Sequence, residues 1–235
     1  MRPTAPRWRA WTVAILLGIG FSWLLLRPQG MEAYEAPAPD LLDHPALAEV
    51  VPLVLRGAAS LDDGIPLLAP FDGAGPPCGY GAPTAGVFYC AEDESLQVDV
   101  DLMGDLVEAP DLARAYVVAH GLAHHLQEAQ GVGARVRGAR ARVSPVAGND
   151  LSVRNELHAD CIAGAILHRA GFSGADAEAV LARVGDAGEE RVRRGGRAVP
   201  ETWTHGAPVD RLHWLQRGLE AGDLAACDPF DIAPR

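Results

Sequence analysis

The chain has 235 residues, 49% of them hydrophobic, which suits one anchor and one domain with a buried core. Its formal net charge is -11. Because residues 1–30 hold four arginines and no acidic residue, the other residues carry 16 arginines against 31 acids, or -15. Such a charge repels nucleic acid and anionic lipid, so we exclude a nucleic-acid-binding function.

The N-terminus is basic and is followed by 17 apolar residues, 10–26, that end at Arg27. This length is at the lower limit for a membrane-spanning helix and just above a usual signal-peptide core. Arg7 and Arg9 precede the segment and favour a cytoplasmic N-terminus. We favour an uncleaved anchor over a cleaved signal peptide, because the small residues 36–38 are followed by a proline.

The expected order is therefore a cytoplasmic N-terminus at 1–9, a transmembrane signal anchor at 10–27 and a Pro/Ala-rich tether at 28–45. Residues 46–235 then form one domain outside the cytoplasm, periplasmic or extracellular. The protein is expected to be a single-pass membrane protein.

The first part of this domain is short of regular patterns. Residues 47–55 form a mostly apolar run of uncertain type, and residues 73–86 are rich in Gly and Pro and predict a loop. Residues 87–90 and 96–100 are apolar or alternating runs around an acidic turn, which predicts a β-hairpin.

Helices follow the hairpin. Pro110 suits a first helical turn, apolar residues then recur at helical spacing, and Gly131 ends the pattern. Residues 134–150 are predicted to be an Arg/Gly-rich connection.

The second long helix is expected to be capped by Asn149 or Asp150 and to stop at Gly171. A third helix is predicted from Ser173 to about residue 185, and a fourth from about 208 to 221.

Four cysteines, at 78, 90, 161 and 227, suggest disulfides in an exported domain. Three pairings are possible, and Cys78–Cys90 with Cys161–Cys227 is the simplest. The absence of any Cys-x-x-Cys spacing disfavours a zinc ribbon.

Two histidines and two carboxylates form the candidate site. His120 and His124 are four apart on the first long helix, so both imidazoles face one side, which suits chelation of one metal ion. On the second helix, Glu156 can complete a His₂Glu site. Asp160, one turn on, can accept the free N–H of a ligand histidine. The alternative is a set of ordinary polar side chains on solvated helix faces.

These residues stand in a longer pattern that resembles the bacterial neutral zinc metallopeptidase family, whose members have an N-terminal membrane segment. The resemblance covers residues 78–230. It rests on Phe88-Tyr89-Cys90, Val98-Asp99, Ala115 to His120, His124 to Gln127, Ser152 to Arg154, Glu156-Leu157, Ala159 to Cys161, Thr204 to Gly206, Trp214, Arg217-Gly218 and Gly222-Asp223.

The resemblance implies zinc as the cofactor, His120, His124 and Glu156 as its ligands, and Asp160 in contact with a ligand histidine. It also supports the simplest pairing of the cysteines. The implied fold class is α+β, a mainly helical zincin-like domain with a small β-hairpin or sheet. In such folds an edge strand lines the substrate cleft, and 96–100 is the expected strand.

One position departs from the family pattern His-Glu-x-x-His. Gly121 stands where the family has the glutamate that acts as general base, so no catalytic residue is assigned. His158 and His205 are possible accessory residues, although each more often has a structural or surface role.

The main hypothesis is a membrane-anchored family member that binds zinc, is catalytically impaired or inactive, and binds a peptide or protein at the cell envelope. One alternative is an active zinc-dependent neutral endopeptidase with a non-standard base. A second alternative is a structural remnant without metal.

Overall fold

The computed structural model describes residues 41, 43–62, 64–71, 87–99, 103–104, 106–181 and 205–230. The expected cytoplasmic N-terminus, the anchor and most of the tether lie outside these residues. Within the described ranges, no helix combines the length and the hydropathy needed to cross a membrane.

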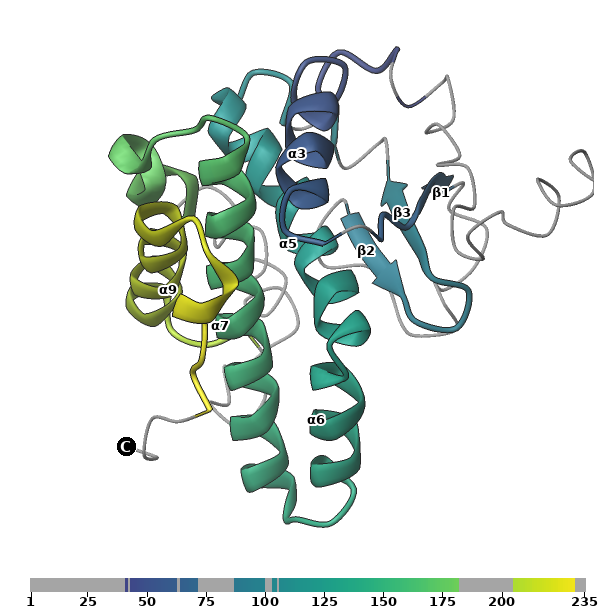
Figure 1. Cartoon of the computed structure of the whole chain (residues 1–235), viewed down its shortest axis with the longest axis vertical. Helices are drawn as coiled ribbons and strands as arrows, with labels where there is room; N and C mark the ends of the chain where they lie inside the picture. The colour runs from purple at the N-terminus through teal and green to yellow at the C-terminus, as the bar shows by residue number, and fades with distance from the viewer. Residues whose placement is uncertain are drawn as a thin grey trace, which may run out of the picture. The chain divides into compact units, whose positions relative to one another are not determined.

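The described part is mainly helical with one small sheet, which confirms the α+β class. The finer expectation of a zincin-like fold stays a prediction. The elements are α3 (Val50–Ala59), β1 (Leu67–Phe71), β2 (Val87–Cys90), β3 (Ser95–Asp99), α5 (Asp111–Ala129), α6 (Val132–Arg140), α7 (Pro145–Arg169) and α9 (Pro208–Ala221), with short 3₁₀ turns at Gly174–Asp176 and Leu224–Ala226 (Figure 1).

The predicted hairpin is present, because β2 and β3 pair antiparallel. The sheet also contains β1, which the sequence pattern did not reveal and which pairs parallel with β3. Among the described strands the order is β1-β3-β2, so β3 is central, and the prediction of 96–100 as an edge strand is wrong. Pro70 lacks a backbone N–H, which suits β1 to a sheet edge.

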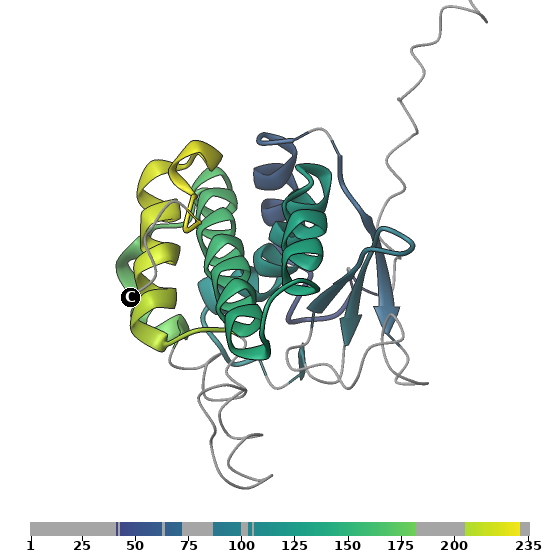
Figure 2. The same ribbon diagram turned by 90° about the horizontal axis from the view of Figure 1, so that it is seen from below.

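The helices and the sheet are layered around α5. Figure 2 shows α5 between the sheet and α7, with α9 on the far side of α7. The hydrophobic core joins these layers through side chains such as Leu96 of β3, Leu122 of α5 and Ile162 of α7, none of them exposed by more than 1%. The first long helix is therefore buried on two sides.

Close contact between α7 and α9 depends on glycines. A Cβ added at Gly218 would lie 1.9 Å from the carbonyl oxygen of Cys161, and one at Gly164 would lie 2.3 Å from that of Leu215. Only glycine allows the two backbones to approach this closely. The approach brings the start of α9 beside the middle of α7, where the candidate site lies.

Several helix boundaries differ from expectation. Much of the predicted connection 134–150 is helical, because Ala and Arg, which favour helices, outweigh its glycines in α6. Helix α7 starts at Pro145, capped by the Ser144 hydroxyl, so the caps predicted at Asn149 and Asp150 are wrong.

The remaining predictions have mixed outcomes. The uncertain run at 47–55 contributes to α3. The predicted third helix begins as a 3₁₀ turn without a side-chain cap from Ser173, and helical residues are described as far as 181. Helix α9 has the predicted bounds.

Candidate metal centre

The two histidines of α5 meet a carboxylate of α7. His120 Nε2 lies 3.2 Å from Glu156 Oε2, and His124 Nε2 lies 3.5 Å from the same oxygen. One ligand atom from each of the three residues lies within 4.8 Å of the others. All three side chains are partly buried, and the imidazoles lie one helical turn apart, as their spacing predicts. These three residues are positioned to bind a metal ion.

Asp160 lies behind His120. Its carboxylate is fully buried, and Oδ1 is 3.0 Å from His120 Nδ1. A carboxylate at Nδ1 keeps the proton on that nitrogen and directs Nε2 toward Glu156, which is the usual support of a histidine that binds zinc.

Tyr116 and Arg211 hold Asp160 in turn, and sequence reasoning assigned neither of them to the site. Arg211, on α9, donates from Nε to Asp160 Oδ2 at 2.9 Å and from Nη2 to Oδ1 at 3.0 Å. Its Nη2 also donates to Tyr116 Oη at 2.7 Å, and the tyrosine hydroxyl donates to Asp160. The available signals were the i, i+4 spacing of Tyr116 and His120 and the proximity of Arg211 to the Thr-His-Gly motif.

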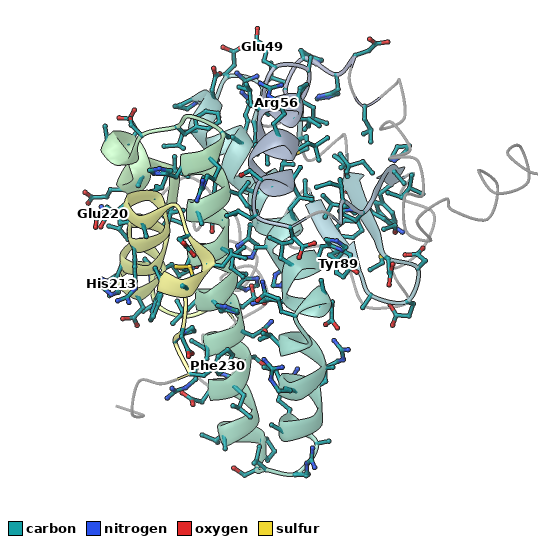
Figure 3. All side chains as sticks on the ribbon, in the orientation of Figure 1. Glu49, Arg56, Tyr89, His213, Glu220 and Phe230 are labelled. Carbon is teal, nitrogen blue, oxygen red and sulfur yellow. A yellow bond between two sulfur atoms is a disulfide. The ribbon has the colours of Figure 1, made fainter. Side chains whose placement is uncertain are left out.

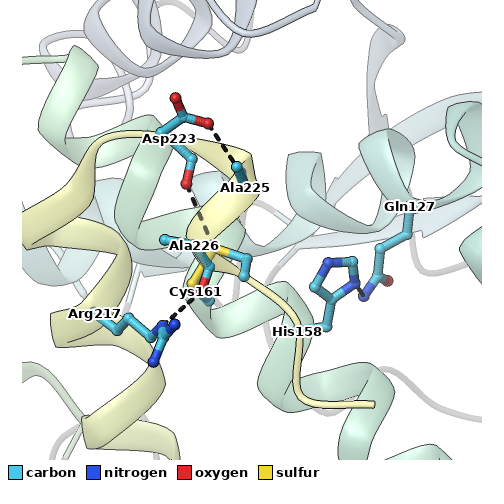
Figure 4. The surroundings of a disulfide bond; sticks show 8 residues. Gln127, His158, Cys161, Arg217, Asp223, Ala225 and Ala226 are labelled. Carbon is cyan, nitrogen blue, oxygen red and sulfur yellow. Dashed lines mark hydrogen bonds between the residues drawn. A yellow bond between two sulfur atoms is a disulfide. The ribbon is translucent and has the colours of Figure 1, made fainter. Parts of the chain in front are cut away.

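Gln127 gives His124 a similar support. Its Oε1 lies 2.9 Å from His124 Nδ1, and its Nε2 donates to the Asn155 carbonyl at 2.7 Å. His158 Nδ1 lies 3.2 Å from the same Nε2 (Figure 4). His158 thus orients Gln127 and does not face the metal-ligand atoms. Burial lowers the pKa of His158 to about 4, so it is neutral near pH 7.

His205 lies on the other side of Glu156. Its Nε2 is 3.6 Å from Glu156 Oε2, but it is not part of the group of three converging ligand atoms. Burial lowers the pKa of His205, against the attraction of Glu156. Of the two possible accessory histidines, only this one contacts a proposed metal ligand.

The sheet covers α5 at Gly121, the position that departs from the family pattern. A Cβ at Gly121 would lie 2.7 Å from Leu96 Cδ1 and 2.8 Å from Val87 Cγ1. Contacts this short do not occur between unstrained carbon atoms. A side chain at position 121 would therefore require the side chains of Leu96 on β3 and Val87 on β2 to shift.

The cysteines brace the helical side of the site. Cys161 and Cys227 form a disulfide that ties α7, one residue after Asp160, to the segment after α9 (Figure 4). Cys90 is disulfide-bonded as well, and Cys78, its expected partner, lies outside the described residues.

The electrostatics of the site favour the ionised forms of both Asp160 and Glu156. Burial alone would raise the pKa of Asp160, but Arg211 outweighs it and holds the pKa at about 2. Burial opposes ionisation of Glu156 too, yet the nearby His124 and His120 hold its pKa well below the usual range. For His120, hydrogen bonding with Asp160 and Glu156 overcomes burial and raises the pKa to about 9.

The donor set fits zinc. A tetrahedral zinc ion with ligands at about 2 Å separates neighbouring ligand atoms by about 3.3 Å, close to the 3.2 and 3.5 Å found here. Two imidazoles and one carboxylate are common zinc ligands, and the raised pKa of His120 means that a bound ion must displace its proton.

Comparison with known proteins agrees with this geometry. Residues 68–230 match the model of the family described as "Putative neutral zinc metallopeptidase". The chain belongs to this family of zinc metallopeptidases. No solved structure matches it.

Uncharacterized proteins of two bacteria are similar to this chain. The uncharacterized protein YpfJ of Escherichia coli K12 is 35% identical over 163 residues, which cover 65% of this chain and 57% of that protein. The uncharacterized protein Rv2575 of Mycobacterium tuberculosis H37Rv is 34% identical over 177 residues, which cover 66% of this chain and 59% of that protein. The metallopeptidase region matched here thus spans less than two thirds of these relatives.

Proposed function

We propose that this chain is a zinc-binding member of the metallopeptidase family in which peptide hydrolysis is lost or strongly impaired. The observation that carries the proposal is Gly121, which stands at the position of the family's general base with Leu96 and Val87 filling the space beside it. A general base contributes about 10²- to 10⁴-fold in rate, or roughly 3–5 kcal/mol of barrier.

Other nearby groups on α5 and α7 have different partners. Glu128 forms a two-point contact with Arg137. The His125 ring packs edge-on against Tyr89 at 5.2 Å, and His158 contacts Gln127. None of these groups replaces the missing glutamate in the arrangement described.

A binding role at the cell envelope is part of the proposal. The Cys161–Cys227 disulfide supports an oxidising compartment, and the apolar segment at 10–27 supports a single membrane anchor with the domain periplasmic or extracellular. A peptide or protein is the proposed ligand, because the family's metal site is retained without the residue that would cleave a bound chain.

A second candidate is an active peptidase that uses His205 as its base. The supporting observation is the 3.6 Å separation of His205 Nε2 from Glu156 Oε2, which brings a neutral imidazole beside a proposed metal ligand.

Metal analysis and a peptidase assay of the purified full chain test the proposal. We expect one zinc per chain, lost in His120→Ala, and no hydrolysis above background. Hydrolysis that both 1,10-phenanthroline and His120→Ala abolish would support the active alternative. A folded chain without stoichiometric zinc would support the metal-free remnant.

Restoring the glutamate sharpens the test. Gly121→Glu alone is expected to give little activity, because the new side chain meets Leu96 and Val87. Gly121→Glu combined with Leu96→Ala and Val87→Ala opens room and should raise zinc-dependent hydrolysis above that of a control with Leu96→Ala and Val87→Ala alone. Equal rates in the triple variant and this control, with zinc bound to both, would mean that more than the base has diverged.

A further inference from the structure

The hairpin formed by α6, the turn after it and the start of α7 differs in charge from the rest of the domain. Residues 131–149 contain four arginines and no acidic residue, whereas residues 31–235 together carry -15. All four arginines are exposed, and Arg137 among them pairs with Glu128 of α5; the four are Arg135, Arg137, Arg140 and Arg142.

The same region exposes apolar side chains. Residues 140–147 are all exposed, and within them Val143 is 45% and Val146 is 64% exposed. Two of the four large hydrophobic residues exposed in the described part of the chain therefore lie next to the arginines. We name residues 135–147 the α6–α7 tip.

The tip also has a hollow between its helices. A depression of about 520 Å³ is lined by residues that include Arg137, Arg140, Ser144 and Asn149. Its guanidinium, hydroxyl and amide groups can donate hydrogen bonds to phosphate oxygens. In Figure 1 the turn between α6 and α7 lies at one end of the described elements, away from the sheet.

We propose that the α6–α7 tip docks on the anionic surface of a lipid bilayer. Arginines near an anionic membrane each raise binding about fivefold, and exposed apolar side chains enter the boundary between headgroups and acyl chains. Val143 and Val146 lie within a few residues of the exposed Arg140 and Arg142, so one short stretch of surface offers both kinds of contact. This inference is independent of metal binding and of the fate of the peptidase activity.

A bilayer fits the tip better than a protein partner does. A stable protein interface uses about 20–30 residues on each side, more than the tip provides. The acidic remainder of the domain, repelled by anionic lipid, then selects the orientation: the tip faces the membrane and the other surfaces point away. Screening over about 8 Å at physiological salt limits the repulsion that reaches the tip.

Docking would place the metal centre near the membrane. Glu156 follows Pro145 by eleven residues on α7, which corresponds to about 16 Å along the helix. A ligand of the metal centre would then be a peptide segment that lies close to the bilayer.

A fluorescent label on the full chain tests the proposal. Val146→Cys carries an environment-sensitive fluorophore, and Val209→Cys, at a valine of α9 that is 70% exposed, is the matched control. Each labelled chain is studied with vesicles of phosphatidylcholine alone and of phosphatidylcholine mixed with phosphatidylglycerol. We expect a blue shift only for the label at 146, only on the anionic vesicles, and weaker at high salt.

Charge variants complete the test. Arg140→Gln with Arg142→Gln should lower the inserted fraction of the label at 146, with a partition constant roughly 30-fold smaller, whereas the double lysine variant should retain insertion. Circular dichroism checks the folding of each variant. Equal emission at 146 and 209, or equal emission on neutral and anionic vesicles, would overturn the proposal. It would also be overturned if the label at 146 stayed in water on both kinds of vesicle, which is the result expected if the tip binds an acidic protein instead.

Discussion

Two neighbouring residues of α5 face different parts of the molecule. His120 points toward α7, where Glu156 and Asp160 contact its two ring nitrogens. Gly121 faces β2 and β3, whose side chains fill the space beside it. One side of the helix presents residues that could hold a metal ion, whereas on the other side the sheet packs against the position where the family has its glutamate.

The two sides of α5 depend on different kinds of contact. On the side of His120, charged groups of α5, α7 and α9 contact one another, and residue 121 takes no part in these contacts. On the side of Gly121 the contacts are apolar, such as those of Leu96. We therefore expect that the base can be absent while the proposed metal ligands keep their arrangement.

The largest expected effect comes from removing a proposed metal ligand. If zinc binds the folded chain only, free zinc at 1,000 times its Kd should stabilise it by about 4 kcal/mol, and His120→Ala should abolish that increment. Thermal or urea unfolding with and without zinc measures it. His213→Ala is the control, since His213 is exposed on α9 and lies at the edge of the molecule in Figure 3. If zinc did not stabilise the wild-type chain, the proposal that His120, His124 and Glu156 bind zinc would be wrong.

A milder change tests whether α9 positions the ligand histidine. Arg211→Lys keeps the positive charge beside Asp160 but loses the two-point contact of the guanidinium. We expect zinc affinity to fall about tenfold, the lower end of the usual effect of such supporting residues. A competition titration with a chelating dye measures the affinity.

The control for this change is on the same helix. Arg217→Lys alters an exposed arginine that contacts the Ala226 carbonyl and the Trp214 ring, so zinc affinity should not change. Visible spectra of the cobalt-substituted chain give a second readout, because a rotated His120 changes the ligand field while a general loss of stability does not. Equal affinities for the two variants would restrict Arg211 to a structural role.

Local sequence signals predicted the elements that depend on neighbouring residues. The spacing of His120 and His124 placed both on one helical face, and the alternation around residues 91–94 predicted the antiparallel strands correctly. Helix α9 followed from Pro208 at its start and a glycine after its end. Each of these signals lies within a few residues of the structure that it predicts.

Contacts between distant residues left no such signal. The pairing of β1 with β3 joins strands that are far apart in the sequence, and a short run that contains Pro70 does not have the pattern of a strand. The hydrogen bond between Arg211 and Tyr116 spans 95 positions. The departure at Gly121 was visible in the sequence, but the closure by Leu96 and Val87 was not, because it depends on how the sheet packs on α5.

The smallest expected effect tests that closure. Alanine is a better helix former than glycine by about 1 kcal/mol, so Gly121→Ala in open space would be stabilising. Here its Cβ would lie 2.7 Å from Leu96 Cδ1, and overpacking of this kind costs about 1–3 kcal/mol. We therefore expect a net destabilisation of roughly 1 kcal/mol in urea unfolding.

Gly148→Ala is the matched control for this last change, because Gly148 is also inside a helix and its nearest neighbour would be 3.9 Å from an added Cβ. That variant should be more stable than the wild type. In a background with Leu96→Ala and Val87→Ala, Gly121→Ala should lose its cost, because both atoms that its Cβ meets are gone. If Gly121→Ala instead stabilises the chain as Gly148→Ala does, the sheet leaves room at position 121. The two sides of α5 would then differ only in the one missing carboxylate, and Gly121→Glu alone should restore hydrolysis.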